Sequence, residues 1–160
     1  MSGFQYLVPT VAASVQAIYS LDSQLTFPQN ATTVHSLVIG NALPSYQDSY
    51  ELSFLIQINN GGTYGIVISN SLDDIFNQSV ASGPNSYITV LIRATRGLSN
   101  DVETCIFWCQ LTQNNESPQI SSVVSTMAEM ADQDISISIT CPVACSAIIY
   151  WANGFKILAP

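Results

Sequence analysis

The sequence predicts an all-β fold, a sandwich of two antiparallel sheets. Three observations carry this prediction: about ten short strand-like stretches, a turn signal after nearly every one of them, and no convincing long helix. Jelly-roll topology is favoured over an immunoglobulin-like sandwich, because two cysteine-bearing stretches that are not consecutive can pair as neighbours in one sheet. The length of 160 residues suits one domain, so we expect 1–160 to be a single β-sandwich domain.

The predicted strands follow from alternation and from β-branched and aromatic residues. Residues 135–140 alternate isoleucine with serine or threonine, which is typical of a strand with one buried and one wet face. Residues 102–112 are apolar at both alternating positions, which predicts a strand that is either covered on both sides by other elements or placed at a subunit contact. The strand-like ranges are 4–8, 14–21, 32–39, 50–58, 63–69, 87–94, 102–112, 119–124, 135–140, 147–151 and 155–158.

Turn and helix signals fill the remaining segments. Residues 59–62 read Asn-Asn-Gly-Gly between two strands and predict a β-hairpin with a type I′ turn, because both central residues of that turn need positive φ. Asn153 and Gly154 predict a second tight turn. At most two short helices are expected, over 71–78 with Ser71 as cap and over 126–132 with a capping box.

All four cysteines lie in two Cys-x-x-x-Cys stretches near the C-terminal end. Opposite residues in an antiparallel strand pair have a constant sum of positions. Cys105 with Cys145, and Cys109 with Cys141, share one such sum, so a single register would set both pairs face to face. Pro142 lacks a backbone donor and therefore indicates a strand end, an edge or a bulge at this point.

Three states are open to these cysteines. Opposed cysteines can form disulfides, or they can remain free buried thiols that pack as small hydrophobes. Zinc is the weakest alternative, since cysteines four apart on a strand are about 13 Å apart, and the residues between Cys105 and Cys109 include no turn former. We expect no metal and no cofactor.

Charge is scarce and mostly negative. Apolar residues make up 48% of the chain and charged residues only 9%, with a net charge of −8. The three cations are Arg93, Arg96 and Lys156, too few to neutralise phosphates or an anionic membrane surface. We therefore expect no direct nucleic-acid or membrane partner. So little charge also suggests that other copies cover part of the surface.

Candidate chemistry is sparse. The single histidine, His35, is expected to be a structural residue on the wetter face of its strand. Close carboxylate pairs such as Asp132 and Asp134 are expected to be solvated positions instead of calcium or glycosidase sites. Trp108, Tyr150 and Trp151 are candidates for a protein interface or for stacking on a sugar.

These observations favour a non-enzymatic structural subunit: a self-associating virion shell, surface-projection or decoration protein. A carbohydrate-binding, lectin-like module is the alternative, and a small carboxylate hydrolase is third. No run is long enough to span a bilayer, and the first residues lack the positive charge of a secretory signal peptide. We expect the protein at a virion or extracellular surface.

Overall fold

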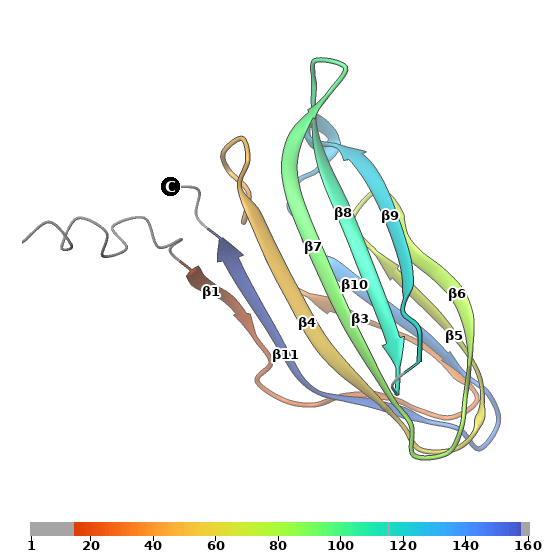
Figure 1. Cartoon of the computed structure of the whole chain (residues 1–160). Coiled ribbons are helices and arrows are strands. Elements are labelled where there is room, and N and C mark those ends of the chain that lie inside the picture. The colour runs from red at the N-terminus through yellow and green to blue at the C-terminus, as the bar shows by residue number, and fades with distance from the viewer. Residues whose placement is uncertain (1–14, 115, 158–160) are drawn as a thin grey trace, which may run out of the picture.

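The computed structural model describes residues 15–114 and 116–157, and it confirms the all-β sandwich (Figure 1). Eleven strands form two antiparallel sheets, one of seven strands and one of four. The strands are β1 (Val15–Ser20), β2 (Leu25–Phe27), β3 (Ala31–Leu37), β4 (Ser49–Ile58), β5 (Gly62–Ser69), β6 (Asp74–Ser82), β7 (Tyr87–Ser99), β8 (Val102–Gln113), β9 (Gln119–Thr126), β10 (Ile135–Cys141) and β11 (Ala147–Ile157).

The strand pairing is that of a jelly roll. Four antiparallel pairs are nested inside one another: β5 with β6, β4 with β7, β3 with β10, and β2 with β11. The chain therefore folds like a long hairpin that is then rolled up, so that its early and late strands become neighbours. The jelly-roll prediction is confirmed, and the immunoglobulin-like alternative is not adopted.

The two sheets differ in width. The four-stranded sheet has the order β3-β10-β5-β6. The other sheet begins with β1-β11-β4-β7 and is widened by the β8–β9 hairpin, which adds two strands beside β7. Figure 1 shows these wide and narrow sheets as two stacked layers. We call them the wide sheet and the narrow sheet.

Side-chain alternation places the core between the two layers. Along β4, every second residue from Tyr50 to Ile58 is completely buried, while the residues between them face outward. On β10, Ile135, Ile137 and Ile139 are buried, and the serines between them are only partly covered. The predicted one-face-wet strand is thus confirmed. The wide sheet contributes Cys105, Phe107 and Cys109 of β8 to the same core.

The predicted hairpin at 59–62 is wrong. β4 belongs to the wide sheet and β5 to the narrow one, so this segment crosses between layers. Its asparagines bind the loop before β11: Asn59 Oδ1 accepts from the Ser146 amide at 2.7 Å, and Asn60 Nδ2 donates to the Ala144 carbonyl at 2.6 Å. These long-range hydrogen bonds replace the local pairing that the Asn-Gly signal predicts.

The type I′ geometry occurs elsewhere. Asn100 and Asp101 have φ of 50° and 63°, and they join Ser99 to Val102 in the β7–β8 hairpin. The predicted turn at Asn153-Gly154 is wrong, because both residues lie inside the continuous strand β11. Gly154 is needed there for close approach, since a Cβ would lie 3.0 Å from the Cβ of Tyr19 on β1.

Helix is almost absent from the residues that the structure describes. The helix expected over 71–78 is wrong: most of that range is strand β6, which pairs with β5. The turn before it is closed by Asn70, whose Oδ1 accepts from the amides of Leu72 and Asp73, both at 2.7 Å. The second expected helix shrinks to a 3-10 turn, Met127–Glu129, and Thr126 caps it without a side-chain hydrogen bond.

The predicted opposition of Cys105 with Cys145 and of Cys109 with Cys141 is also wrong. β8 pairs with β7 and β9, so Cys105 faces Arg96 and Ser125, and Cys109 faces Ile92 and Ser121. Cys141 ends β10 in the other sheet, opposite Ala31. The constant-sum argument fails because β8 takes its neighbours along the chain as partners. All four thiols are free and buried.

The crossover at Gly62 yields a stability prediction. A Cβ at this position would lie 2.9 Å from Cys145 Sγ and 2.9 Å from Pro142 Cγ, so Gly62→Ala should destabilise the fold by about 1–3 kcal/mol through overpacking. Gly97→Ala is the matched control, because its nearest neighbour would be Ile106 Cδ1 at 3.9 Å. Urea unfolding of both variants measures the difference, and equal stabilities would contradict the packing argument.

Candidate functional site

The outward side of the wide sheet is the most distinctive surface of the described structure. Across β11, β4, β7, β8 and β9, the outward residues form rows because the registers of these strands are continuous. We call this surface the wide face. Its large side chains include Tyr150, Trp151 and Phe155 on β11, Leu55 on β4, Tyr87 and Leu91 on β7, Ile106 and Trp108 on β8, and Ile120 and Val124 on β9.

One ion pair stands in the middle of this face. Phe155, Glu51, Arg93 and Trp108 are successive partners across four strands. Arg93 Nε donates to Glu51 Oε1 at 2.9 Å, and its guanidinium carbon lies 5.6 Å from the centre of the Trp108 ring. Glu51 and Arg93 are the only charged residues in the outward rows of these five strands, and they neutralise each other.

The predicted candidates Trp108, Tyr150 and Trp151 all lie on the wide sheet, but in two places. Tyr150 and Trp151 are 47% and 41% exposed, at a β-bulge where two residues of β11 oppose one of β4. Trp108 lies three strands away and is half-buried beneath Arg93. The sequence analysis missed the aliphatic half of this face, Ile106, Ile120 and Val124. Of the two expectations for 102–112, cover by another element fails at Ile106, which is 40% exposed among the described residues. The other expectation, a subunit contact, stays a prediction.

The outward side of the narrow sheet is chemically different. Its rows consist mainly of serine and threonine, such as Thr32 beside Thr140, whose hydroxyls are 2.7 Å apart, and Ser36 beside Ser136. Val34 is its large exposed aliphatic residue, at 60%. Aromatic side chains on strand faces therefore concentrate on the outside of one sheet.

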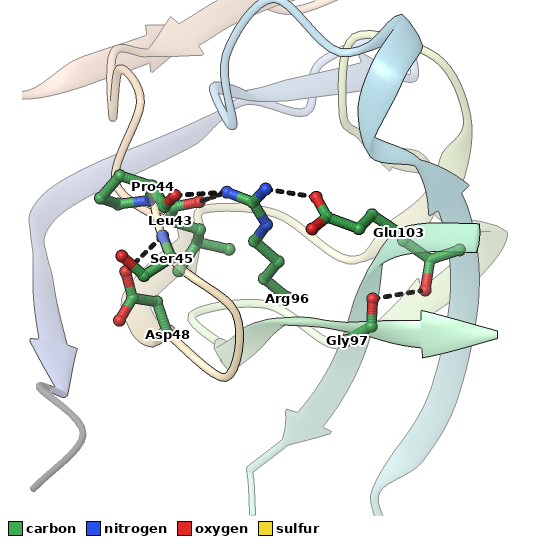
Figure 2. Close-up of polar contacts among 8 residues, drawn as sticks. Leu43, Pro44, Ser45, Asp48, Arg96, Gly97 and Glu103 are labelled. Atoms are coloured by element: carbon green, nitrogen blue, oxygen red, sulfur yellow. Dashed lines mark hydrogen bonds and ion pairs between the residues drawn. The ribbon is translucent and has the colours of Figure 1, made fainter. Parts of the chain in front are cut away.

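Arg96 binds the loop between β3 and β4 to the wide sheet (Figure 2). Its Nη1 donates to the carbonyls of Leu43 and Pro44, and its Nη2 forms an ion pair with Glu103. The backbone of Arg96 also exchanges hydrogen bonds with this loop, since its amide donates to the Asp48 carbonyl at 2.9 Å. Arg96 is a structural residue whose side chain is only 18% exposed.

Lys156 holds the same loop from the other side. Its Nζ lies 3.2 Å from Asp48 Oδ2. The Asp48 carboxylate also accepts from the Ser45 amide at 2.9 Å, and Figure 2 shows this second contact. All three cations of the sequence are thus engaged in ion pairs, with Glu51, Glu103 and Asp48. None of the three is available to a phosphate without breaking an internal contact.

The carboxylate pairs have structural contacts. Asp134 accepts from the amides of Ile39 and Gly40 at 2.8 and 2.7 Å, and Asp73 accepts from the Ser125 hydroxyl at 2.6 Å. Within 15–114 and 116–157, no three His, Cys, Asp or Glu side chains are placed to hold a metal ion.

His35 is a structural residue. The sequence predicted that it lies on the wetter face of its strand, and that prediction is wrong. Its Nε2 lies 2.9 Å from the Thr26 carbonyl, and its ring packs edge-on against Phe27 at 4.9 Å. The strand β2 covers it. An open pocket of about 320 Å³ lies nearby, where the β1–β2 loop meets β3 and its extension, lined in part by Tyr19, Asp22 and Ser36.

No family model matches this sequence, and no curated protein matches it. Among solved structures, peanut lectin with a bound 9-residue peptide superposes with a TM-score of 0.49 and 9% identity, covering 96% of this chain and 94% of the lectin. A Lotus tetragonolobus seed lectin has a TM-score of 0.45 and 12% identity, covering 94% and 95%. A structure of infectious bursal disease virus has 0.34 and 14%, covering 92% of this chain but 33% of that one. Likenesses this distant say nothing about function.

Among the residues that the structure describes, no helix is long and apolar enough to cross a membrane.

The Arg96 contacts predict a difference between two arginines. Arg96→Ala leaves two carbonyls and a carboxylate without their donor, and should lower the free energy of unfolding by about 1–3 kcal/mol. Arg93→Ala is the control: its side chain is 51% exposed, and its ion pair should contribute less than about 1 kcal/mol. Denaturant unfolding compares them, and a larger loss in Arg93→Ala would contradict the assignment.

The buried thiols predict a pH dependence. Burial raises the pKa of Cys105 and of Cys109 from 9.0 to about 12. Above about pH 9 the folded protein keeps these protons while the unfolded chain releases them. The stabilisation from the two buried thiols is therefore complete below about pH 9, and the free energy of unfolding falls as the pH rises toward 12. Urea unfolding at pH 7, 9 and 10 should show this decline, and the double variant Cys105→Ala/Cys109→Ala should show a shallower one. Equal slopes would contradict it.

Proposed function

We propose that this chain is a non-enzymatic structural subunit that self-associates, as the building block of a virion shell, a surface projection or a decoration layer. The observation that carries this proposal is the wide face. It presents aromatic and aliphatic side chains over five adjacent strands, with one internally paired set of charges. Polar residues such as Ser53, Thr89 and Gln110 lie between these side chains, but large exposed apolar groups gathered on one face are typical of an interaction site.

The composition of the wide face supports a protein partner. Protein interfaces are enriched in tryptophan, tyrosine, phenylalanine and arginine and are depleted of lysine and carboxylates at their centre. Trp108, Arg93, Tyr150, Trp151 and Phe155 match that preference. The paired state of Arg93, Arg96 and Lys156 gives no basic surface for a genome, which favours an outer or accessory layer over a shell that contacts nucleic acid.

Carbohydrate binding is the second candidate, and one observation favours it. Tyr150 and Trp151 are adjacent and exposed at the β11 bulge, where flat rings could stack on a sugar. If this candidate function is correct, the chain should bind sugars on a glycan array, and Trp151→Ala should abolish that binding. Binding by a monomeric protein would favour a lectin-like module over a building block.

Self-association is the expected result in solution. At about 10 µM, light scattering after size exclusion should give a mass of two or more copies. Each copy carries a net charge of −8, so salt should screen the repulsion between copies, and raising sodium chloride from about 0.05 to 0.5 M should increase the associated fraction. A monomer at all these conditions would overturn the proposal.

A further inference from the structure

The two sheets end in four edge strands, and three of these have a feature that hinders the addition of a further strand. β1 and β9 end the wide sheet, and β3 and β6 end the narrow sheet. Proteins commonly protect such edges with a bulge, a charge or a covering loop. β1 has a register shift between Ala17 and Tyr19, and β6 begins at Asp74, directly after Asp73. The β1–β2 loop lies beside the end of β3, where it shares the open pocket with Ser36.

Neither a charge nor a bulge interrupts β9. Gln119–Thr126 contains no charged residue and no proline, and all eight positions pair with β8 without a register shift. Beyond β8, the hydrogen bonds of β9 in the described structure come from inward side chains. The Ser121 hydroxyl donates to the Ile75 carbonyl at 2.6 Å, and the Ser125 hydroxyl donates to Asp73 Oδ2 at 2.6 Å. The outer edge of β9 is therefore regular and uncharged, and its backbone groups are open to a further strand.

The sequence of β9 is complementary to itself in one antiparallel register. Opposite residues of an antiparallel pair lie on the same face of the sheet. With Ser122 opposite its own equivalent, Ile120 faces the partner's Val124 on the outward side, and such aliphatic pairs stabilise a sheet. Ser121 then faces the partner's Val123 on the inward side. A register centred on Val123 would instead set Ile120 and Val124 opposite polar residues, so Ser122 is the favoured centre.

A second copy of β9 fits this edge in charge and in continuity. A contact between two identical surfaces repeats every charge on both sides of the axis, which is repulsive for most of a chain with a net charge of −8. β9 carries no charge and avoids that repulsion. The outward rows also continue across such a contact: Trp108 and Ser122 are neighbours in one row, which would run on to the partner's Ser122 and Trp108.

We propose that β9 strands of two copies pair antiparallel about a two-fold axis through Ser122, perpendicular to the sheet, and so join two wide sheets into one. This rests on the proposed function that the chain self-associates, and it adds a contact at the sheet edge that is separate from the wide face. A shell or layer needs at least two different contacts, because a single isologous contact closes a dimer.

Charges placed at the axis test the pairing. Ser122→Glu and Ser122→Lys each set two like charges opposite each other, and each should raise the dissociation constant of self-association about 10-fold or more. An equal mixture of the two variants sets opposite charges against each other and should return the constant to within about 3-fold of the wild type. Val34→Glu and Val34→Lys, at a residue 60% exposed on the edge strand β3, are matched controls that should stay within about 2-fold, alone or mixed. Sedimentation velocity measures these constants, and unfolding curves check that all four variants remain folded.

A disulfide tests the register. Ser122→Cys should form a covalent dimer with oxidised glutathione, because opposite Cα atoms of an antiparallel pair lie about 4.5–5.5 Å apart, within the range of a disulfide. Gln119→Cys is the control on the same strand, since the register sets its two copies about 20 Å apart. It should remain monomeric on a non-reducing gel, as should the wild type, whose four thiols are buried.

The outcomes separate this contact from self-association itself. If the wild type associates but the Ser122 mixture does not recover and Ser122→Cys does not cross-link, the β9 contact is wrong and self-association stands. Weakened association in both Val34 variants, with recovery in their mixture, would assign the contact to β3 and would also overturn the β9 pairing. If the wild type is monomeric at all concentrations and salt conditions, the proposed function fails, and this inference fails with it.

Discussion

The alternation of side chains along β4, β7 and β8 is the constraint on which the rest of this structure depends. Burying Tyr50, Leu52 and Phe54 of β4 requires Glu51, Ser53 and Leu55 to face outward. The same rule on β8 buries Cys105, Phe107 and Cys109 and turns Ile106 and Trp108 out. A slip of one residue would exchange the two sets, so the core and the wide face are determined together.

The narrow sheet makes clear that alternation does not by itself create an apolar exterior. β10 buries isoleucines at every second position exactly as regularly as β4 buries its core residues, yet its outward residues are Ser136, Ser138 and Thr140. Both outward sides avoid charge. Only the wide sheet combines few charges with large rings and branched chains, the side chains that are typical of protein interfaces.

The few charges have a common structural use. Arg96 and Lys156 bind the β3–β4 loop from two sides, and Arg93 closes an ion pair with Glu51 over Trp108. Asp134 accepts from the Ile39 amide in the segment after β3, and Asp73 accepts from the Ser125 hydroxyl on β9. A chain with so few ionic groups uses them to hold loops against strands, where a backbone polar group would otherwise lack a partner.

Some features could be predicted from local pattern alone. Alternation and β-branched residues determined the all-β class and the strands around Tyr50–Ile58 and 135–140. Trp108, Tyr150 and Trp151 could be named only as candidates, because they are large rings with a polar handle. The strand count and the absence of a long helix predicted an all-β sandwich, and the strand count together with the expected cysteine pairing favoured the jelly roll. The cysteine register that supported it was wrong, because a constant sum identifies a possible pairing without excluding the hairpin that β8 forms with β7.

The sequence by itself determined which residues alternate, where the chain is apolar and how little charge it carries, since these are properties of neighbours along the chain. Only the tertiary structure decided that Asn59–Gly62 crosses between sheets, that Asn153 and Gly154 continue a strand, and that Ile106, Ile120 and Val124 complete one exterior face. Each of these depends on contacts between segments far apart in sequence. Such contacts override local turn and periodicity preferences because they bury more surface and satisfy more backbone groups than a local turn can.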